Sequence, residues 1–160
     1  MELKLVLFLC TGNYYRSRFA EEMFNFWAPV ECPGWRAISR GIAVDLGANN
    51  IGPFSKSAAH ALLSNGVAFN WKLARMPMQL EAVDLERADH IVALKKGEHL
   101  PLLRERFPSW LSSNEPARIE YWRIEDVDQM PPAQALPLIL GELQALMKRL
   151  SRDPTGAGGG

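Results

Sequence analysis

A cysteine and an arginine near the start of the chain have the types and spacing needed to hold and attack a phosphate-like anion. Cys10 ends an apolar run, and Arg16 and Ser17 follow after a short polar turn. Within that turn, Gly12 can adopt a positive φ at no steric cost, and Asn13 tolerates the left-handed region better than most residues. We therefore expect the turn to direct several backbone N–H groups, together with the first turn of a helix, toward one bound anion.

The same residues predict nucleophilic chemistry. Arg16 supplies a planar fork of donors that can meet two oxygens of a phosphoryl group. Positive charge around Cys10 favours its thiolate, which is a good nucleophile for phosphorus. The Ser17 hydroxyl is placed to donate to that thiolate and later to help it leave. The predicted phosphate-binding residues are Thr11, Gly12, Asn13, Tyr14, Tyr15, Arg16 and Ser17.

The elements around this loop indicate an α/β fold. The apolar run at 3–9 is typical of a strand that is buried on both faces, and helical spacing of apolar residues begins at Ser17. Strands that alternate with helices form parallel sheets covered on both sides, and ligands bind beyond the carboxyl ends of such strands. Further strands are predicted at 35–44, 89–94 and 117–124, and helices at 56–66, 80–88, 97–107 and over the apolar face from Leu136 to Leu150.

Composition narrows the class of protein. The 160 residues predict one domain over 1–152 and a flexible, glycine-rich tail over 153–160. A formal net charge of zero gives no reason to expect nucleic-acid or membrane attraction. Two cysteines are too few for a disulfide framework and favour a cytoplasmic setting. The three histidines share no metal-ligand spacing, so neither a metal nor a cofactor is expected.

The loop also resembles a known family. Cys10, five intervening residues, Arg16 and Ser17, with Gly12 and Asn13 inside, are similar to the start of the low-molecular-weight protein tyrosine phosphatases. The segments "SRGI" (39–42) and "DHIVAL" (89–94) stand in the family's order. The resemblance implies a three-layer α/β/α sandwich around a four-stranded parallel sheet. It also implies a two-step, metal-free phosphatase that passes through a cysteinyl-phosphate and acts on a phosphotyrosine-bearing protein or a small aryl phosphate.

The resemblance places a general acid after the last strand. The segment "YWRIEDVDQMPP" (121–132) offers Glu125, Asp126 and Asp128. The family pattern there is Asp-Pro, whereas Val127 follows Asp126 in this chain. We assign Asp126 as the acid because of its position and keep Asp128 as the alternative. The same carboxylate would then activate water to hydrolyse the intermediate.

Further departures from the family pattern lie close to the loop. Tyr15 occupies a place where the family often has a second cysteine, and Arg18 replaces the usual proline. We expect Arg18 to add positive charge near the mouth of the site and to favour acidic peptides. Tyr14, Tyr15 and Phe54 are the candidates for the pocket walls.

Two other functions fit the same loop. The first is arsenate reduction, which in its thioredoxin-coupled form needs further cysteines. Only Cys32 is present besides Cys10, so only a glutaredoxin-coupled version stays open. The second is a phosphate-binding module without turnover, which the missing proline beside Asp126 would permit.

Overall fold

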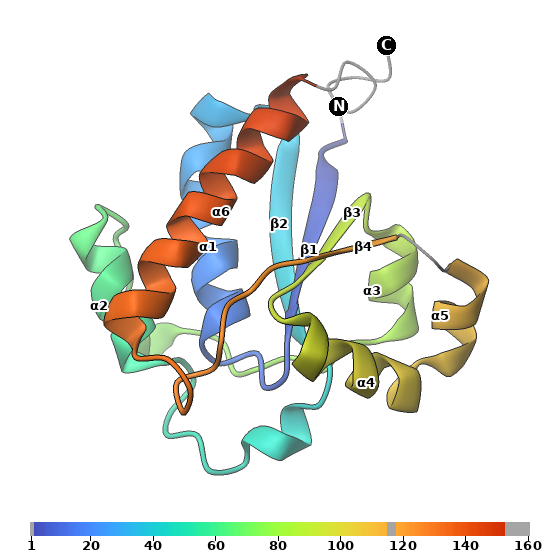
Figure 1. Cartoon of the computed structure of the whole chain (residues 1–160). Coiled ribbons are helices and arrows are strands. Elements are labelled where there is room, and N and C mark those ends of the chain that lie inside the picture. The colour runs from blue at the N-terminus through green and yellow to red at the C-terminus, as the bar shows by residue number, and fades with distance from the viewer. Residues whose placement is uncertain (1, 115–117, 153–160) are drawn as a thin grey trace.

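A single four-stranded parallel sheet organises the chain, with the strand order β2-β1-β3-β4. The computed structural model describes residues 2–114 and 118–152. Its topology confirms the predicted α/β fold and the three-layer arrangement (Figure 1). The strands are β1 (Lys4–Cys10), β2 (Trp35–Gly41), β3 (His90–Ala93) and β4 (Ile119–Tyr121).

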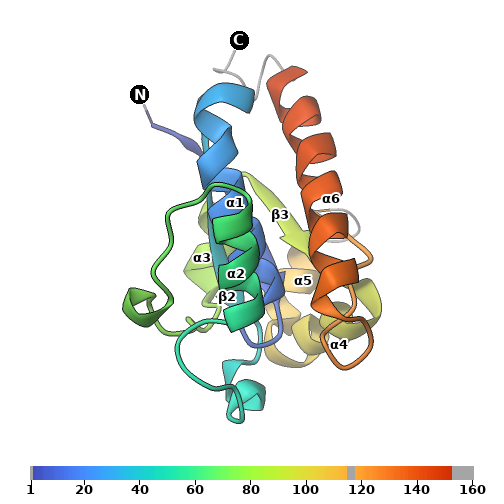
Figure 2. The same ribbon diagram turned by 90° about the vertical axis from the view of Figure 1, so that its left-hand side faces the viewer.

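Helices cover both faces of this sheet. Figures 1 and 2 show α1, α2 and α6 together on one face, whereas α3, α4 and α5 lie on the other. The helices of the first face are α1 (Arg16–Glu31), α2 (Lys56–Ser64) and α6 (Pro132–Arg152). Those of the second are α3 (Ala82–Arg87), α4 (Lys96–Arg106) and α5 (Pro108–Asn114), and short 3-10 turns span Val44–Gly47 and Trp71–Leu73.

Strand β1 is the centre of the core because it is buried on both sides. Val6 and Phe8 belong to the apolar cluster under α1 and α6, while Leu7 and Leu9 belong to the cluster on the opposite face. Side chains alternate between the faces of a strand, so a continuous apolar run fills both clusters. This packing fixes the carboxyl end of β1, where Cys10 stands.

The predicted elements differ from the observed ones mainly at their ends. The last strand is shorter than 117–124, and residue 117 lies outside the described residues, as does the predicted tail at 153–160. Pro29 lies inside α1, in its last turn. Ser55 caps α2 and accepts a 3.2 Å hydrogen bond from the N–H of Ala58. No helix in the described ranges has the length and apolar character needed to cross a membrane.

Candidate active site

The loop that follows β1 is tied to the end of β2. The backbone N–H groups of Ile42 and Ala43 donate to the carbonyls of Cys10 and Thr11, at 2.9 and 3.0 Å. A Cβ on Gly41 would lie 2.8 Å from the Thr11 carbonyl oxygen and 3.0 Å from the backbone nitrogen of Asn13. Glycine in the "SRGI" segment is therefore explained by the close approach of the loop.

Asn13 holds the loop in shape from the inside. It is the only non-glycine residue in the described parts of the chain with a positive φ, at 52°, and its side chain is fully buried. Its amide nitrogen donates to the hydroxyls of Ser17 and Ser39, at 3.0 and 2.9 Å. Its amide oxygen accepts from the backbone N–H of Met78 at 3.0 Å. Asn13 thus takes the left-handed conformation that its sequence position predicted, whereas Gly12 does not adopt the positive φ open to it.

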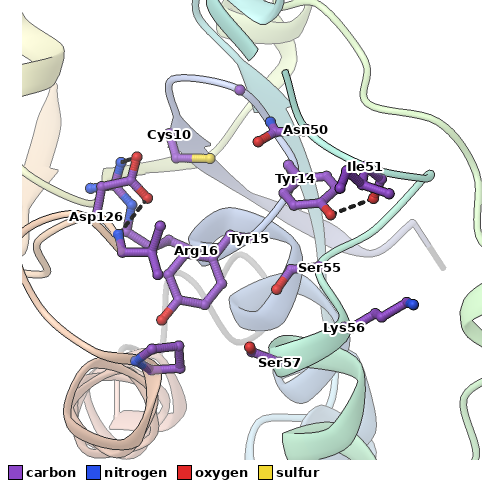
Figure 3. A pocket seen from close by; sticks show the side chains of 13 residues that line it. Cys10, Tyr14, Tyr15, Arg16, Asn50, Ile51, Ser55, Lys56, Ser57 and Asp126 are labelled. Atoms are coloured by element: carbon purple, nitrogen blue, oxygen red, sulfur yellow. Dashed lines mark hydrogen bonds and ion pairs between the residues drawn. The ribbon is translucent and has the colours of Figure 1, made fainter. Parts of the chain in front are cut away.

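The sulfur of Cys10 lines an open pocket of about 380 Å³ at the base of this loop (Figure 3). Its Sγ lies 2.8 Å from the hydroxyl oxygen of Ser17. The backbone N–H groups of Gly12, Tyr14 and Tyr15 donate to none of the residues that the structure describes. A thiol beside a hydroxyl, in a loop whose N–H groups are unengaged, is the arrangement expected of an oxyanion site.

Arg16 is buried, and Glu98 in the first turn of α4 fixes its guanidinium group. Two parallel contacts join Arg16 to Glu98: Nη1 to Oε1 at 3.0 Å and Nη2 to Oε2 at 2.6 Å. The carbonyl of Ile124 accepts a further bond from Nη1 at 2.8 Å, and the Thr11 hydroxyl donates to Glu98. Sequence reasoning missed Glu98. The available signal was an acidic residue just beyond the carboxyl end of a predicted strand, near an arginine that needs a partner once buried.

His99 completes the surroundings of Glu98. Its Nδ1 accepts from the backbone N–H of Lys95 at 3.0 Å, so in the neutral ring Nε2 carries the proton and faces Glu98 Oε2 at 3.1 Å. Burial lowers the pKa of His99, which keeps the ring neutral near pH 7. Burial alone would raise the pKa of Glu98, but the nearby His99 and Arg16 outweigh it and hold that pKa well below its usual range. Glu98 therefore stays ionised near pH 7 and can pair with the buried Arg16 cation.

Asp126 reaches the same pocket from the segment after β4. Its Oδ2 lies 3.7 Å from Nη2 of Arg16, and its side chain is 43% exposed (Figure 3). Asp128 is absent from the lining of this pocket, although both aspartates lie in the described residues. Glu125, the third acidic residue considered, is instead paired with Lys95 at 2.6 Å.

Residues 5–120 match the sequence profile of the low molecular weight phosphotyrosine protein phosphatases. The chain belongs to this family. It is therefore a cysteine-based phosphatase, a phosphomonoester hydrolase, as the loop residues predicted. The family match favours this activity over arsenate reduction and over phosphate binding without turnover. No curated protein sequence matches the chain.

Solved structures of this phosphatase family share the fold. Wzb from Vibrio vulnificus, in complex with benzylphosphonate, has a TM-score of 0.73 and 22% identity, covering 92% of this chain and 99% of that one. The low molecular weight protein tyrosine phosphatase of T. tengcongensis has a TM-score of 0.67 and 26% identity over 92% and 97% of the two chains. SP-PTP from Streptococcus pyogenes has a TM-score of 0.73 and 18% identity over 99% and 100%.

Two of the three expected aromatic walls line the pocket of this phosphatase. The Tyr14 hydroxyl donates to the carbonyl of Ile51, which fixes its ring at the rim (Figure 3). Tyr15 is buried beside Asp126, and burial followed by that negative charge raises the pKa of Tyr15 to about 12. Phe54 does not line the pocket, because it is fully buried against Phe69, with ring centroids 4.4 Å apart.

The remaining sequence expectations fall outside the pocket. We expected Arg18 to add positive charge at the mouth of the site, and this was wrong. Arg18 is only 2% exposed and does not line the pocket. Cys32 is also buried, and burial followed by the charge of Glu31 raises the pKa of its thiol to about 11. Within the described ranges, no group of three or more His, Cys, Asp or Glu side chains is arranged to hold a metal ion.

Proposed function

We propose that this phosphatase hydrolyses phosphotyrosine in proteins, or small aryl phosphates, with Cys10 as nucleophile, Arg16 as anion-binding residue and Asp126 as general acid. One observation supports the assignment above all: Cys10 and Arg16 of the loop line a single pocket together with Asp126, which comes from a distant part of the chain (Figure 3).

The first step transfers the phosphoryl group to sulfur. The Cys10 thiolate forms an S–P bond in line with the leaving oxygen, and the P–O bond to the aryl group breaks. Asp126 donates its proton to the departing phenolate. Arg16 and the N–H groups of residues 12–17 stabilise the charge that spreads over the three equatorial oxygens.

The second step releases phosphate. Asp126, now ionised, removes a proton from a water molecule, whose oxygen bonds to phosphorus as the S–P bond breaks. The hydroxyl of Ser17, 2.8 Å from Sγ, stabilises the thiolate as it leaves. Inorganic phosphate and the free thiolate are the products, so no external oxidant or reductant is needed.

The pocket supports an aromatic leaving group. Tyr14 and Tyr15 provide ring surfaces beside the sulfur, and the similar fold from Vibrio vulnificus was solved with benzylphosphonate. Residues 1–152 form one catalytic domain in this proposal. The cytoplasm is the proposed location, since Cys10 and Cys32 are both free thiols and the first must stay reduced to act.

The test is turnover of p-nitrophenyl phosphate by the wild type and by Cys10→Ser. Cys10→Ser should abolish turnover while phosphate binding persists, and Cys32→Ser should keep full activity as the matched thiol control. Phosphate should also protect Cys10 of the wild type against alkylation by iodoacetamide. Turnover that survives in Cys10→Ser would refute the nucleophile assignment, and phosphate binding without turnover in the wild type would indicate the inactive module. Arsenate-dependent thiol consumption would indicate a reductase.

A further inference from the structure

Arg18 is a buried cation that makes no ion pair with a carboxylate in the described part of the chain. Its guanidinium donates only to backbone carbonyls: Nη1 to Asn13 and Pro53, both at 3.2 Å, and Nη2 to Arg75 at 2.9 Å. The ring of Phe54 lies against it, with 4.7 Å from Cζ to the ring centroid. In the described portion of the chain, no Asp or Glu oxygen lies within ion-pair distance of Arg18.

The two other arginines beside the loop are both compensated. Arg16 is bonded to Glu98, and Arg75 contacts Glu21 at 3.0 Å while also donating to the side-chain oxygen of Asn13. A buried charge is costly unless a counter-charge compensates for it. Among the described residues, Arg18 therefore differs from Arg16 and Arg75 in having no carboxylate at ion-pair distance.

The hydrogen bond from Arg18 to Asn13 also has a directional effect. In a trans peptide the C=O and the following N–H point in opposite directions. Arg18 holds the Asn13 carbonyl from behind, so the N–H of Tyr14 is aimed away from Arg18, where it meets no acceptor among the described residues. The contact thus aims one donor of the oxyanion site.

Several charged groups affect the pKa of Arg18. Burial, followed by the nearby charge of Arg75, lowers the pKa of Arg18 to about 10, while the charges of Glu21, Glu22 and Cys10 oppose this shift. Arg18 is therefore still a cation near pH 7. Glu21 already accepts from Arg75 and from the Ser39 hydroxyl. Glu22, one turn further along α1, also acts on Arg18 ahead of Cys10, so an anion at the centre of the loop adds to the charges of Glu21 and Glu22.

We propose that Arg18 is a positioning residue for the phosphate loop: it holds the Asn13 carbonyl so that the N–H of Tyr14 faces the bound anion, and its buried positive charge favours an anion at the centre of the loop. This inference rests on the proposed role of residues 10–17 as the anion-binding loop. It differs from the role of Arg16, because Arg18 acts through the Asn13 carbonyl and its buried charge without touching the substrate. The proline that the family usually has at this place would supply neither the charge nor the donors.

The experiment compares Arg18→Gln, which keeps a donor but loses the charge, with Arg18→Lys, which keeps the charge. Arg149→Gln is the charge-matched control, because Arg149 is 53% exposed, pairs with Glu120 and lies on α6 seventeen residues beyond the pocket residue Pro132. That separation is roughly 25 Å along a helix. The readouts are the pH midpoint of Cys10 alkylation by iodoacetamide, inhibition by inorganic phosphate, and the melting temperature.

Arg18→Gln should raise the alkylation midpoint by about one pH unit and weaken phosphate inhibition about tenfold, since one unit corresponds to a tenfold change in the equilibrium. Arg18→Lys should restore the midpoint but not the phosphate affinity, because one ammonium group cannot hold three separate carbonyls in place. Arg149→Gln should leave both values unchanged.

Three results would overturn the proposal. If Arg18→Gln lowers only the melting temperature and keeps the wild-type midpoint, Arg18 is merely structural. If neither variant folds at 10 °C, the same conclusion holds. If phosphate fails to protect Cys10 in the wild type, the loop assignment itself is wrong. Protection in the wild type with an unchanged midpoint in Arg18→Gln refutes the role of Arg18 alone.

Discussion

The loop that holds the anion and the segment that carries the acid meet in one pocket, but they are anchored to very different degrees. Asn13 in the loop is fully buried and bonded to Ser17, Ser39 and Met78. Asp126 is 43% exposed, and its closest hydrogen bond is to the next N–H in the chain, that of Val127, at 2.8 Å. Donors that stabilise developing charge work best when they are fixed in advance. A residue that protonates a leaving group and then activates water must stay accessible to both.

The largest effect should come from removing the acid on the exposed side. Asp126→Asn should slow hydrolysis of p-nitrophenyl phosphate by about 10²–10⁴-fold, as for loss of a general acid. Phosphates with more basic leaving groups should suffer most, because they need the proton most. Asp128→Asn is the control, and it should stay within about twofold of the wild type. If the two variants exchange these effects, Asp128 is the acid.

A smaller effect should follow from loosening the anchored side at Glu98. Glu98→Gln keeps the shape but removes the charge that fixes Arg16, and misplaced catalytic groups cost up to about 10²-fold. We expect kcat/KM to fall by about 10–10²-fold, with thiol alkylation of Cys10 still complete. A Glu98→Gln enzyme with normal kcat/KM would show that Ile124 and the loop suffice to hold Arg16.

The same variant should change how stability depends on pH. The pKa of Glu98 is lowered in the folded state, so its charge stabilises the fold above the unfolded value of about 4.3. That contribution is lost as pH falls through the lower folded value. The difference in melting temperature between wild type and Glu98→Gln should therefore be largest near pH 7 and shrink toward acid. A difference that is constant from pH 7 to pH 3 would contradict this linkage.

Disturbing the packing of the loop against β2 should lower the free energy of unfolding. Gly41→Ala places a Cβ within 2.8 Å of the Thr11 carbonyl, and overpacking of this kind costs about 1–3 kcal/mol. The free energy of unfolding in urea should fall by that amount, with a loss of turnover because the loop must shift. Gly141→Ala is the matched control, since nothing lies within 4 Å of its Cβ inside α6. That change should stabilise the fold by roughly 0.5–1 kcal/mol.

The two regions also differ in how far sequence could predict them. Cys10, Gly12, Asn13, Arg16 and Ser17 are close together in the chain, so their spacing carried the geometry of the loop. The parallel sheet followed from the alternation of strands and helices, although α5 and the shortness of β4 did not. The choice between Asp126 and Asp128 depended on the path of the irregular segment after β4. The local sequence pattern does not determine that path.

The contacts that the sequence did not predict are mainly those between residues far apart in the chain. Glu98 meets Arg16 across 82 positions of sequence, and Arg18 meets the Arg75 carbonyl across 57. For Glu98 the available signal was only its place just beyond a predicted strand, and no local signal marks the contact between Arg18 and Arg75. The prediction that Arg18 lies at the mouth was wrong because a charged residue on a helix was assumed to face water. In the structure its helix position faces inward, where three carbonyls satisfy its donors.

The smallest effect should come from a carboxylate that resembles Glu98 but lies away from the pocket. Glu120 accepts from His90, Trp122 and Arg149, at 2.9, 2.6 and 2.7 Å. Burial would raise the pKa of Glu120, but bonds from His90 and Trp122 and the charge of Arg149 lower it to about 2. Glu120→Gln should cost about 1 kcal/mol of unfolding free energy at pH 7, less as pH falls toward 2, and leave kcat/KM unchanged. A loss of kcat/KM equal to that of Glu98→Gln would mean that any weakening of β4 disturbs the site, and that the anchoring of Arg16 by Glu98 is not special.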